Sequence, residues 1–361
     1  MKKLAALFIC AVIISAILRM AASAYDVSAP DLSELTDNGI ISESEASGET
    51  SISITDKLLS ALSSGCTAAL KSALPAFAGI VAVLVLSGTV SAFVAGIENA
   101  QAKTAFSLIS VLALTLAVYP QCVAVTSYIA ECADVLAKVM TAVSSGCMTL
   151  YILEGSAAAA STSAASMSVL GTVLSAISSG ALMPFVQATL ALAVSGALPG
   201  VADLSPISRF IKNTLTTVMA FLFTLYGFAN YIQTAIATAS DSYAYRTVRF
   251  SAGVLIPVIG NMLGEASRTV SGSISVMKAT VGSAGIAAVL TLLLPPVLTV
   301  LCYRIMLNLA SVIAGLLGCE REKRFLSDAA GIFGVLFALV AGIAVTALIT
   351  LAMFIRMGVS A

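Results

Sequence analysis

The stretch AAGIFGVLFALVAGIAVTALITLAMFI, residues 329–355, decides the fold. It holds no charged residue, and Asp328 and Arg356 stand directly before and after it. As an α-helix it would be about 40 Å long, because each residue adds about 1.5 Å. The hydrocarbon core of a bilayer is about 30 Å thick, so the stretch predicts a transmembrane helix that crosses at a tilt.

Other apolar runs of the same kind occupy residues 74–97, 104–125 and 214–236. A further run, 279–301, contains Pro295-Pro296 near its end. Each proline removes a backbone donor and clashes with the preceding turn, so we expect this helix to break or kink there. The run 305–318 is too short to cross a bilayer upright, unless its helix also includes the residues from Pro296 onward, which would bury Arg304.

The whole composition points the same way. The chain has 361 residues, of which 10% are charged and 59% are apolar, with a mean hydropathy of +1.04. Soluble domains carry about 25% charged residues. We therefore predict an all-α, polytopic integral membrane protein with about six to eight transmembrane or re-entrant helices.

The same counts exclude several functions. Lys plus Arg and Asp plus Glu are 18 each, so the net charge is zero, which argues against nucleic-acid binding. The chain has no His, so His-based metal sites and imidazole catalysis are excluded. Its seven Cys form no C-x-x-C motif and predict no disulfide framework. Asp203 and Asp241 are expected in loops, which argues against aspartyl catalysis. We expect no enzyme activity, metal or cofactor.

The N-terminal quarter differs from the rest. Lys2 and Lys3, an apolar core and Ala22-Ser23-Ala24 predict a signal peptide over residues 1–24. Residues 25–73 hold eight acidic and two basic side chains and predict an acidic extracytoplasmic segment, with an amphipathic helix over 52–70. Residues 74–361 form the predicted membrane domain. Arg321, Lys323 and Arg324 place the loop before the last span in the cytoplasm.

A polar stripe marks the region after the second span. Glu131, Asp134 and Lys138 continue a series of polar residues at steps of three and four, which one helix face would carry. The series is Ser127, Glu131, Asp134, Lys138, Thr141 and Ser145. Two interpretations fit it: an amphipathic helix at the membrane interface, or a helix that turns its charges into a bundle or pore.

The following residues are small. Between Gly155 and Met183, 21 of 29 residues are Gly, Ala, Ser or Thr, which favours close helix packing in a membrane. Residues 184–198 form a second, short apolar piece.

The candidate functional segment is FSAGVLIPVIGNMLGEASRTVSGSISVMKATVGSAGI, residues 250–286. It is apolar at first, is interrupted by Pro257 and Gly260, and ends in a glycine-rich return. Two interpretations fit: a re-entrant or broken helix beside a cavity, or an amphipathic surface helix followed by a loop. The polar side chains of the segment are Asn261, Glu265, Arg268 and Lys278.

This segment resembles the stage III sporulation protein AE family of endospore-forming bacteria. The matching residues are Asp241-Ser242, Arg246, Arg249, Ile256-Pro257-Val258-Ile259-Gly260, Thr269-Val270-Ser271-Gly272-Ser273 and Lys278-Ala279-Thr280-Val281-Gly282. The resemblance implies a multi-pass protein of the mother-cell membrane around the forespore. It also implies a channel or secretion-like complex with other membrane subunits and a forespore-made partner, needed for forespore development after engulfment. It assigns no catalytic residue.

Two other functions remain open from the sequence. A secondary transporter would have broken helices and charges at mid-membrane depth, but the chain shows no internal repeat. A scaffold would hold other subunits without a pore of its own. The sequence does not separate a pore from a scaffold.

Overall fold

The computed structural model describes residues 49–95, 100–177, 180, 182–198, 204–255 and 257–356. The chain divides into two compact units, Met1–Lys57 and Leu58–Ala361, and the helical bundle is the second. Every regular element in the described ranges is helical, which confirms the predicted all-α class. The predicted signal peptide and the acidic residues 25–48 lie outside these ranges.

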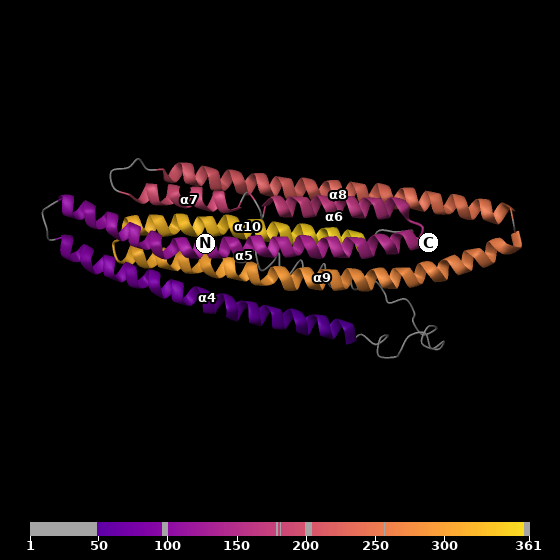
Figure 1. Cartoon of the computed structure of the whole chain (residues 1–361), viewed down its shortest axis with the longest axis horizontal. Coiled ribbons are helices and arrows are strands. Elements are labelled where there is room, and N and C mark those ends of the chain that lie inside the picture. The colour runs from indigo at the N-terminus through magenta and orange to yellow at the C-terminus, as the bar shows by residue number, and fades with distance from the viewer. Residues whose placement is uncertain are drawn as a thin grey trace. The chain divides into compact units, whose positions relative to one another are not determined.

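Seven helices make up the described chain (Figure 1). They are α4 (Glu49–Ala95), α5 (Ala100–Leu153), α6 (Ala157–Ala176), α7 (Leu182–Ala197), α8 (Ser205–Leu255), α9 (Pro257–Leu316) and α10 (Glu320–Arg356). Six of them contain a stretch long and apolar enough to cross a membrane. These stretches are Leu62–Phe93, Thr104–Leu153, Ala157–Ala176, Ser205–Ala244, Gly285–Leu316 and Glu320–Ile355.

The helix α10 forms the centre of the bundle. It packs against α5, α6, α7, α8 and α9, and Figure 1 shows it running between them. Its buried side chains, among them Phe325, Phe333 and Leu351, belong to the main apolar core. The stretch that predicted a membrane helix is thus also the one that organises the bundle.

Glycine turns reverse the chain at both ends of the bundle. Gly155, between α5 and α6, has φ +80°, and Gly318, between α9 and α10, has φ +75°. In the first turn, the Ser156 N–H donates to the Tyr151 carbonyl over 2.9 Å. In the second, the Cys319 N–H donates to the Ala314 carbonyl over 2.9 Å. These bonds satisfy carbonyls at a helix end, and a positive φ there suits glycine.

The break that was one of the two expected effects of the proline pair is not found. Helix α9 continues through Pro295 and Pro296, and residues 305–316 of the short run 305–318 belong to the same helix. In lipid, local bonds re-satisfy the carbonyls that a proline frees, so a helix tolerates it. The α4 backbone packs here, since a Cβ at Gly65 would lie 3.5 Å from the Pro295 Cα.

The small-residue region and the short apolar piece after it form two helices, α6 and α7, rather than a single helix and a loop. Helices α6 and α7 lie end to end beside α8 (Figure 1), and both pack against α5 and α8. Together they make one interrupted passage along the bundle. We call the two ends of the bundle the Cys319 end, where the chain turns from α9 into α10, and the Phe354 end, where α10 ends.

Candidate functional site

A buried ion pair ties α9 to the turn between α5 and α6. The Lys278 ammonium contacts the Glu154 carboxylate, and the two side chains are only 4% and 5% exposed. The Lys278 Nζ also lies 4.7 Å from the centre of the Tyr151 ring, a distance at which a cation is attracted to an aromatic face. The partners of Lys278 inside the bundle therefore include a carboxylate and an aromatic ring.

Tyr151 extends the same group of side chains to α10. Its hydroxyl donates to the Phe354 carbonyl, and the two rings meet edge to face with centroids 4.9 Å apart. Buried tyrosines usually satisfy the hydroxyl in this way. The contact fixes the last turns of α10 against the end of α5.

Asp241 joins the group from α8. Its two carboxylate oxygens accept hydrogen bonds from the Ala158 and Ala159 N–H groups, over 3.1 and 2.8 Å. These amides open α6, whose own N-cap residue, Ser156, makes no side-chain cap. A carboxylate at a helix N-terminus is stabilised by the free amides and the helix dipole. We call Tyr151, Glu154, Asp241, Lys278 and Phe354 the Glu154 cluster.

The position of Asp241 corrects one expectation. We expected Asp203 and Asp241 in loops, but Asp241 lies inside α8, where it caps another helix. Asp203 lies outside the described ranges. The sequence did not indicate this helical position, because the apolar run 214–236 ends before Asp241 whereas α8 continues to Leu255.

Polar contacts also join the helices at the Cys319 end. The Glu322 carboxylate accepts hydrogen bonds from the Ser87 hydroxyl, over 3.0 Å, and from the Ser110 hydroxyl. Burial, together with the nearby Glu322 charge, raises the pKa of the Cys319 thiol. The thiol therefore stays protonated at neutral pH, and it donates to the Leu317 carbonyl over 3.8 Å.

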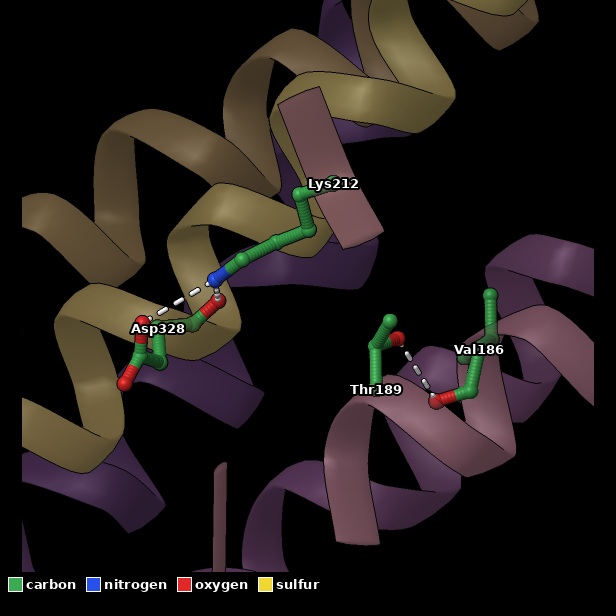
Figure 2. Close-up of polar contacts among 4 residues, drawn as sticks. All are labelled: Val186, Thr189, Lys212 and Asp328. Atoms are coloured by element: carbon green, nitrogen blue, oxygen red, sulfur yellow. Dashed lines mark hydrogen bonds and ion pairs between the residues drawn. The ribbon is translucent and has the colours of Figure 1, made fainter. Parts of the chain in front are cut away.

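A second buried ion pair joins α8 to α10 near this end. Lys212 Nζ lies 3.0 Å from Asp328 Oδ1 and 3.2 Å from the Asp328 carbonyl oxygen (Figure 2). Gly331 makes room for it, since a Cβ there would lie 2.9 Å from Lys212 Nζ. In the same view Thr189 of α7 donates to the Val186 carbonyl of its own helix over 3.2 Å, and so needs no partner from another helix.

Helices α8 and α9 continue past the rest of the bundle at the Phe354 end. The candidate spans end at Ala244 on α8 and begin at Gly285 on α9, yet α8 continues to Leu255 and α9 already begins at Pro257. Figure 1 shows the pair reaching beyond the ends of α5, α6 and α10. We call residues 245–255 and 257–284 the hairpin arm. The Glu154 cluster lies at its base.

The arm contains the candidate functional segment. Pro257 is the first residue of α9, where a missing N–H costs nothing. Gly260, Asn261, Glu265 and Arg268 follow in the first turns of the same helix, and their side chains lie outside the described part of the structure. Lys278 belongs to the Glu154 cluster. Helix α8 ends at Leu255 and α9 begins at Pro257, and Gly260 and the glycine-rich residues after it lie in α9, so residues 257–286 do not contain the loop of the second interpretation.

The polar stripe lies on α5, on a face that this chain leaves open. Lys138 Nζ lies 3.5 Å from Asp134 Oδ2, and these side chains are 76% and 54% exposed. Glu131 is exposed as well. Within the described residues, the stripe therefore does not turn into the bundle of its own chain.

The sequence did not indicate several buried charged residues of the described chain, among them Glu154, Lys212, Glu322 and Asp328. One signal could have found the first, because Glu154 is the single charged residue between Lys138 and Asp203. An isolated charge in an apolar or small-residue stretch must have a partner. Among the residues that the structure describes, no three His, Cys, Asp or Glu side chains come together as a metal site would require.

Comparison with known families settles the relationship. A family profile described as "Stage III sporulation protein AE" matches residues 38–358, nearly the whole described chain. The chain belongs to the stage III sporulation protein AE family. A curated relative of the family, stage III sporulation protein AE of Bacillus subtilis (strain 168), is 27% identical over 127 residues. The match covers 35% of this chain and 32% of the relative, about a third of its length.

No solved structure matches the chain. The predicted family is confirmed, and with it a membrane protein of a sporulation family. Asp241 and Lys278, two of the residues on which the resemblance to the family was based, lie in the same group of side chains, the Glu154 cluster.

Proposed function

We propose that this AE-family protein is a membrane subunit of a stage III channel or secretion-like complex that links mother cell and forespore. It acts in the mother-cell membrane around the forespore and supports forespore development after engulfment. Its partners are other membrane subunits of the complex and a forespore-made protein. No enzymatic step is assigned to it.

The hairpin arm is the observation that carries this proposal. The part of α9 before the buried Lys278, residues 257–277, is a helix about 32 Å long. Paired with the end of α8, it makes a helical projection from one end of the bundle. Arg321, Lys323 and Arg324 at the Cys319 end favour an extracytoplasmic position for the arm, although the arm itself carries Arg246, Arg249 and Arg268. In the mother-cell membrane the arm would then reach into the space that faces the forespore.

The test is a shortened arm. Residues 250–262 are replaced by a short Gly-Ser turn in an endospore-forming host that lacks its own AE protein. We expect engulfment and vegetative growth to be normal and forespore development to arrest, with the variant present in the membrane at the wild-type level. The control is the same Gly-Ser turn substituted for residues 96–99, between α4 and α5. Normal spore counts with the shortened arm would contradict the proposal.

A secondary transporter is the second candidate, and one observation favours it. The passage formed by α6 and α7 is interrupted inside the bundle, as helices at transporter binding sites are. The two candidates differ in what the arm does. A transporter would retain activity when the arm is shortened, whereas a subunit that reaches a partner would not.

A further inference from the structure

The depth of the polar stripe on α5 can be read from its neighbours. Toward the Cys319 end, the Tyr303 hydroxyl donates to Gln121 of α5 over 3.0 Å, and the Tyr303 ring stacks on Phe333 of α10 at 5.6 Å. Gln121 and Phe333 therefore lie at one level. Toward the Phe354 end, a Cβ at Gly285 would lie within 3.7 Å of Val143 of α5 and 3.4 Å of Leu351 of α10.

Glu131, Asp134 and Lys138 all lie between Gln121 and Val143 on α5. The matching part of α10 runs from Phe333 to Leu351, in the middle of the uncharged stretch 329–355. A bilayer that covers this stretch also covers the charges of the stripe. The stripe from Ser127 to Ser145 is about 27 Å long, close to the thickness of the hydrocarbon core.

A lipid environment is unfavourable for the charged side chains of the α5 stripe. Each charged side chain at mid-bilayer costs about 2.5–3.5 kcal/mol even on the scales that give the lowest penalty. Here Asp134 and Lys138 pair with each other but are more than half exposed in the single chain. Intramembrane charges normally face a bundle interior or a water-filled cavity. The bundle of this chain provides neither for the described stripe, so other chains must complete it.

We propose that several copies of this chain assemble with their α5 stripes around a shared, water-filled path that favours cations. This inference rests on the proposed function and names the helix that lines the path. Both signs of charge occur in one stripe. In parallel copies related by rotation, Asp134 of one copy lies about one helical turn, about 6 Å along the axis, from the level of Lys138 of the next, within reach of the long lysine side chain. Each stripe has two acidic residues and one basic residue, and the surplus of negative charge attracts cations.

The residues beside the stripe fit contacts between copies. Tyr128, Val135 and Met148 are exposed apolar side chains of α5. At about 3.6 residues per turn, Tyr128 and Val135 lie on one flank of the stripe and Met148 on the other. Around the stripe they offer an apolar border that a neighbouring copy can cover. A closed ring of copies is the common solution when one patch must be buried by identical chains.

The test uses the purified full chain in lipid vesicles, with all seven cysteines replaced and one new cysteine at a time. Ser127→Cys, Asp134→Cys and Thr141→Cys probe the stripe. Phe221→Cys is the control: Phe221 is 65% exposed on α8, and its near neighbour Phe223 packs at Gly342, at the same depth. A charged, membrane-impermeant thiol reagent should modify the stripe positions at least about tenfold faster than the control, because lipid excludes it.

A flexible bifunctional thiol reagent then tests what surrounds the path. We expect cross-links between copies at Ser127→Cys and Thr141→Cys and none at Phe221→Cys. Modification without cross-links would overturn the shared path between copies and point to a different chain. Equal, slow modification at the stripe and the control would overturn the water-filled path.

Ion flux gives a readout that does not depend on sporulation. Vesicles with the wild-type chain should pass potassium in preference to chloride, and Asp134→Lys should reduce or reverse the preference. Normal flux with defective spores from a shortened arm would support both proposals. Absent flux and absent cross-links with the same sporulation defect would overturn the pore inference and leave the proposed function standing.

Discussion

The Lys278 ammonium is held inside the bundle by the Glu154 carboxylate and the Tyr151 ring. Removing one partner of a buried ion pair leaves an uncompensated charge and costs about 3–5 kcal/mol. We expect Lys278→Met and Glu154→Leu each to lower the unfolding temperature in detergent. The double variant Lys278→Met with Glu154→Leu should lose less than the sum of the two. Strict additivity would show that the pair does not act as a unit.

Asp241 gives a second prediction for a single residue. Asp241→Ala removes both acceptors from the first turn of α6 and should cost about 1–2 kcal/mol, as lost caps do. Hydrogen exchange should speed up first at Ala158 and Ala159, whose amides lose their partners. The neighbouring Ser242→Ala is the matched control and should leave these amides protected. Unchanged exchange in Asp241→Ala would mean that the cap does not hold α6.

Among the elements, the hairpin arm carries the sharpest functional prediction. Pro257→Ala replaces the first residue of α9, a position that needs no N–H donor, so we expect normal membrane levels and normal spore counts. Gly260→Leu improves helix propensity by up to about 1 kcal/mol and should not unfold α9. If the arm binds a partner near its turn, a bulky side chain there should lower spore counts.

Gly260→Ala is the control for that experiment, because it changes propensity in the same direction with little added volume. Spores and membrane protein level are scored in the same strains. Normal spore counts for Gly260→Leu at the wild-type protein level would exclude the turn of the arm as a contact site.

Secondary structure was predictable where apolar length alone decided it, and this explains why the stretch 329–355 predicted α10 correctly. The continuity of α9 was not predictable, since Pro295 and Pro296 argue for a break by local rules. Their tolerance depends on packing, such as Gly65 of α4 against Pro295. The Glu154 cluster could be predicted only in part, because its members come from α5, α8, α9 and α10 and from the turn between α5 and α6.

For the whole molecule, the pairing of helix ends gives one consistent topology. Ser87, Ser110 and Glu322 meet at the Cys319 end, and Tyr151 meets Phe354 at the other. With α6 and α7 as one interrupted passage, the described helices would cross the membrane six times. An extracytoplasmic start then agrees with a cytoplasmic basic loop at residues 319–324, as the charges predict.

Cysteine labelling from outside tests this topology. In a background without native cysteines, Ser47→Cys should react with an impermeant reagent in intact cells, and Ser327→Cys should react only after the membrane is opened. Ser327 is exposed on α10, so folding does not hide it. Labelling of Ser327→Cys but not Ser47→Cys in intact cells would invert the orientation and place the hairpin arm in the cytoplasm.

The central position of α10 has a consequence for how the protein is made. A ribosome releases α10 after every helix that it packs against, so α5 to α9 enter the membrane before their common core exists. During translation, the ion pair between Lys212 and Asp328 is also incomplete, because its two halves are 116 residues apart. Unfinished chains therefore expose unpaired charge to lipid or to the insertion machinery. A membrane protease that recognises such charge would remove every chain that stops before α10.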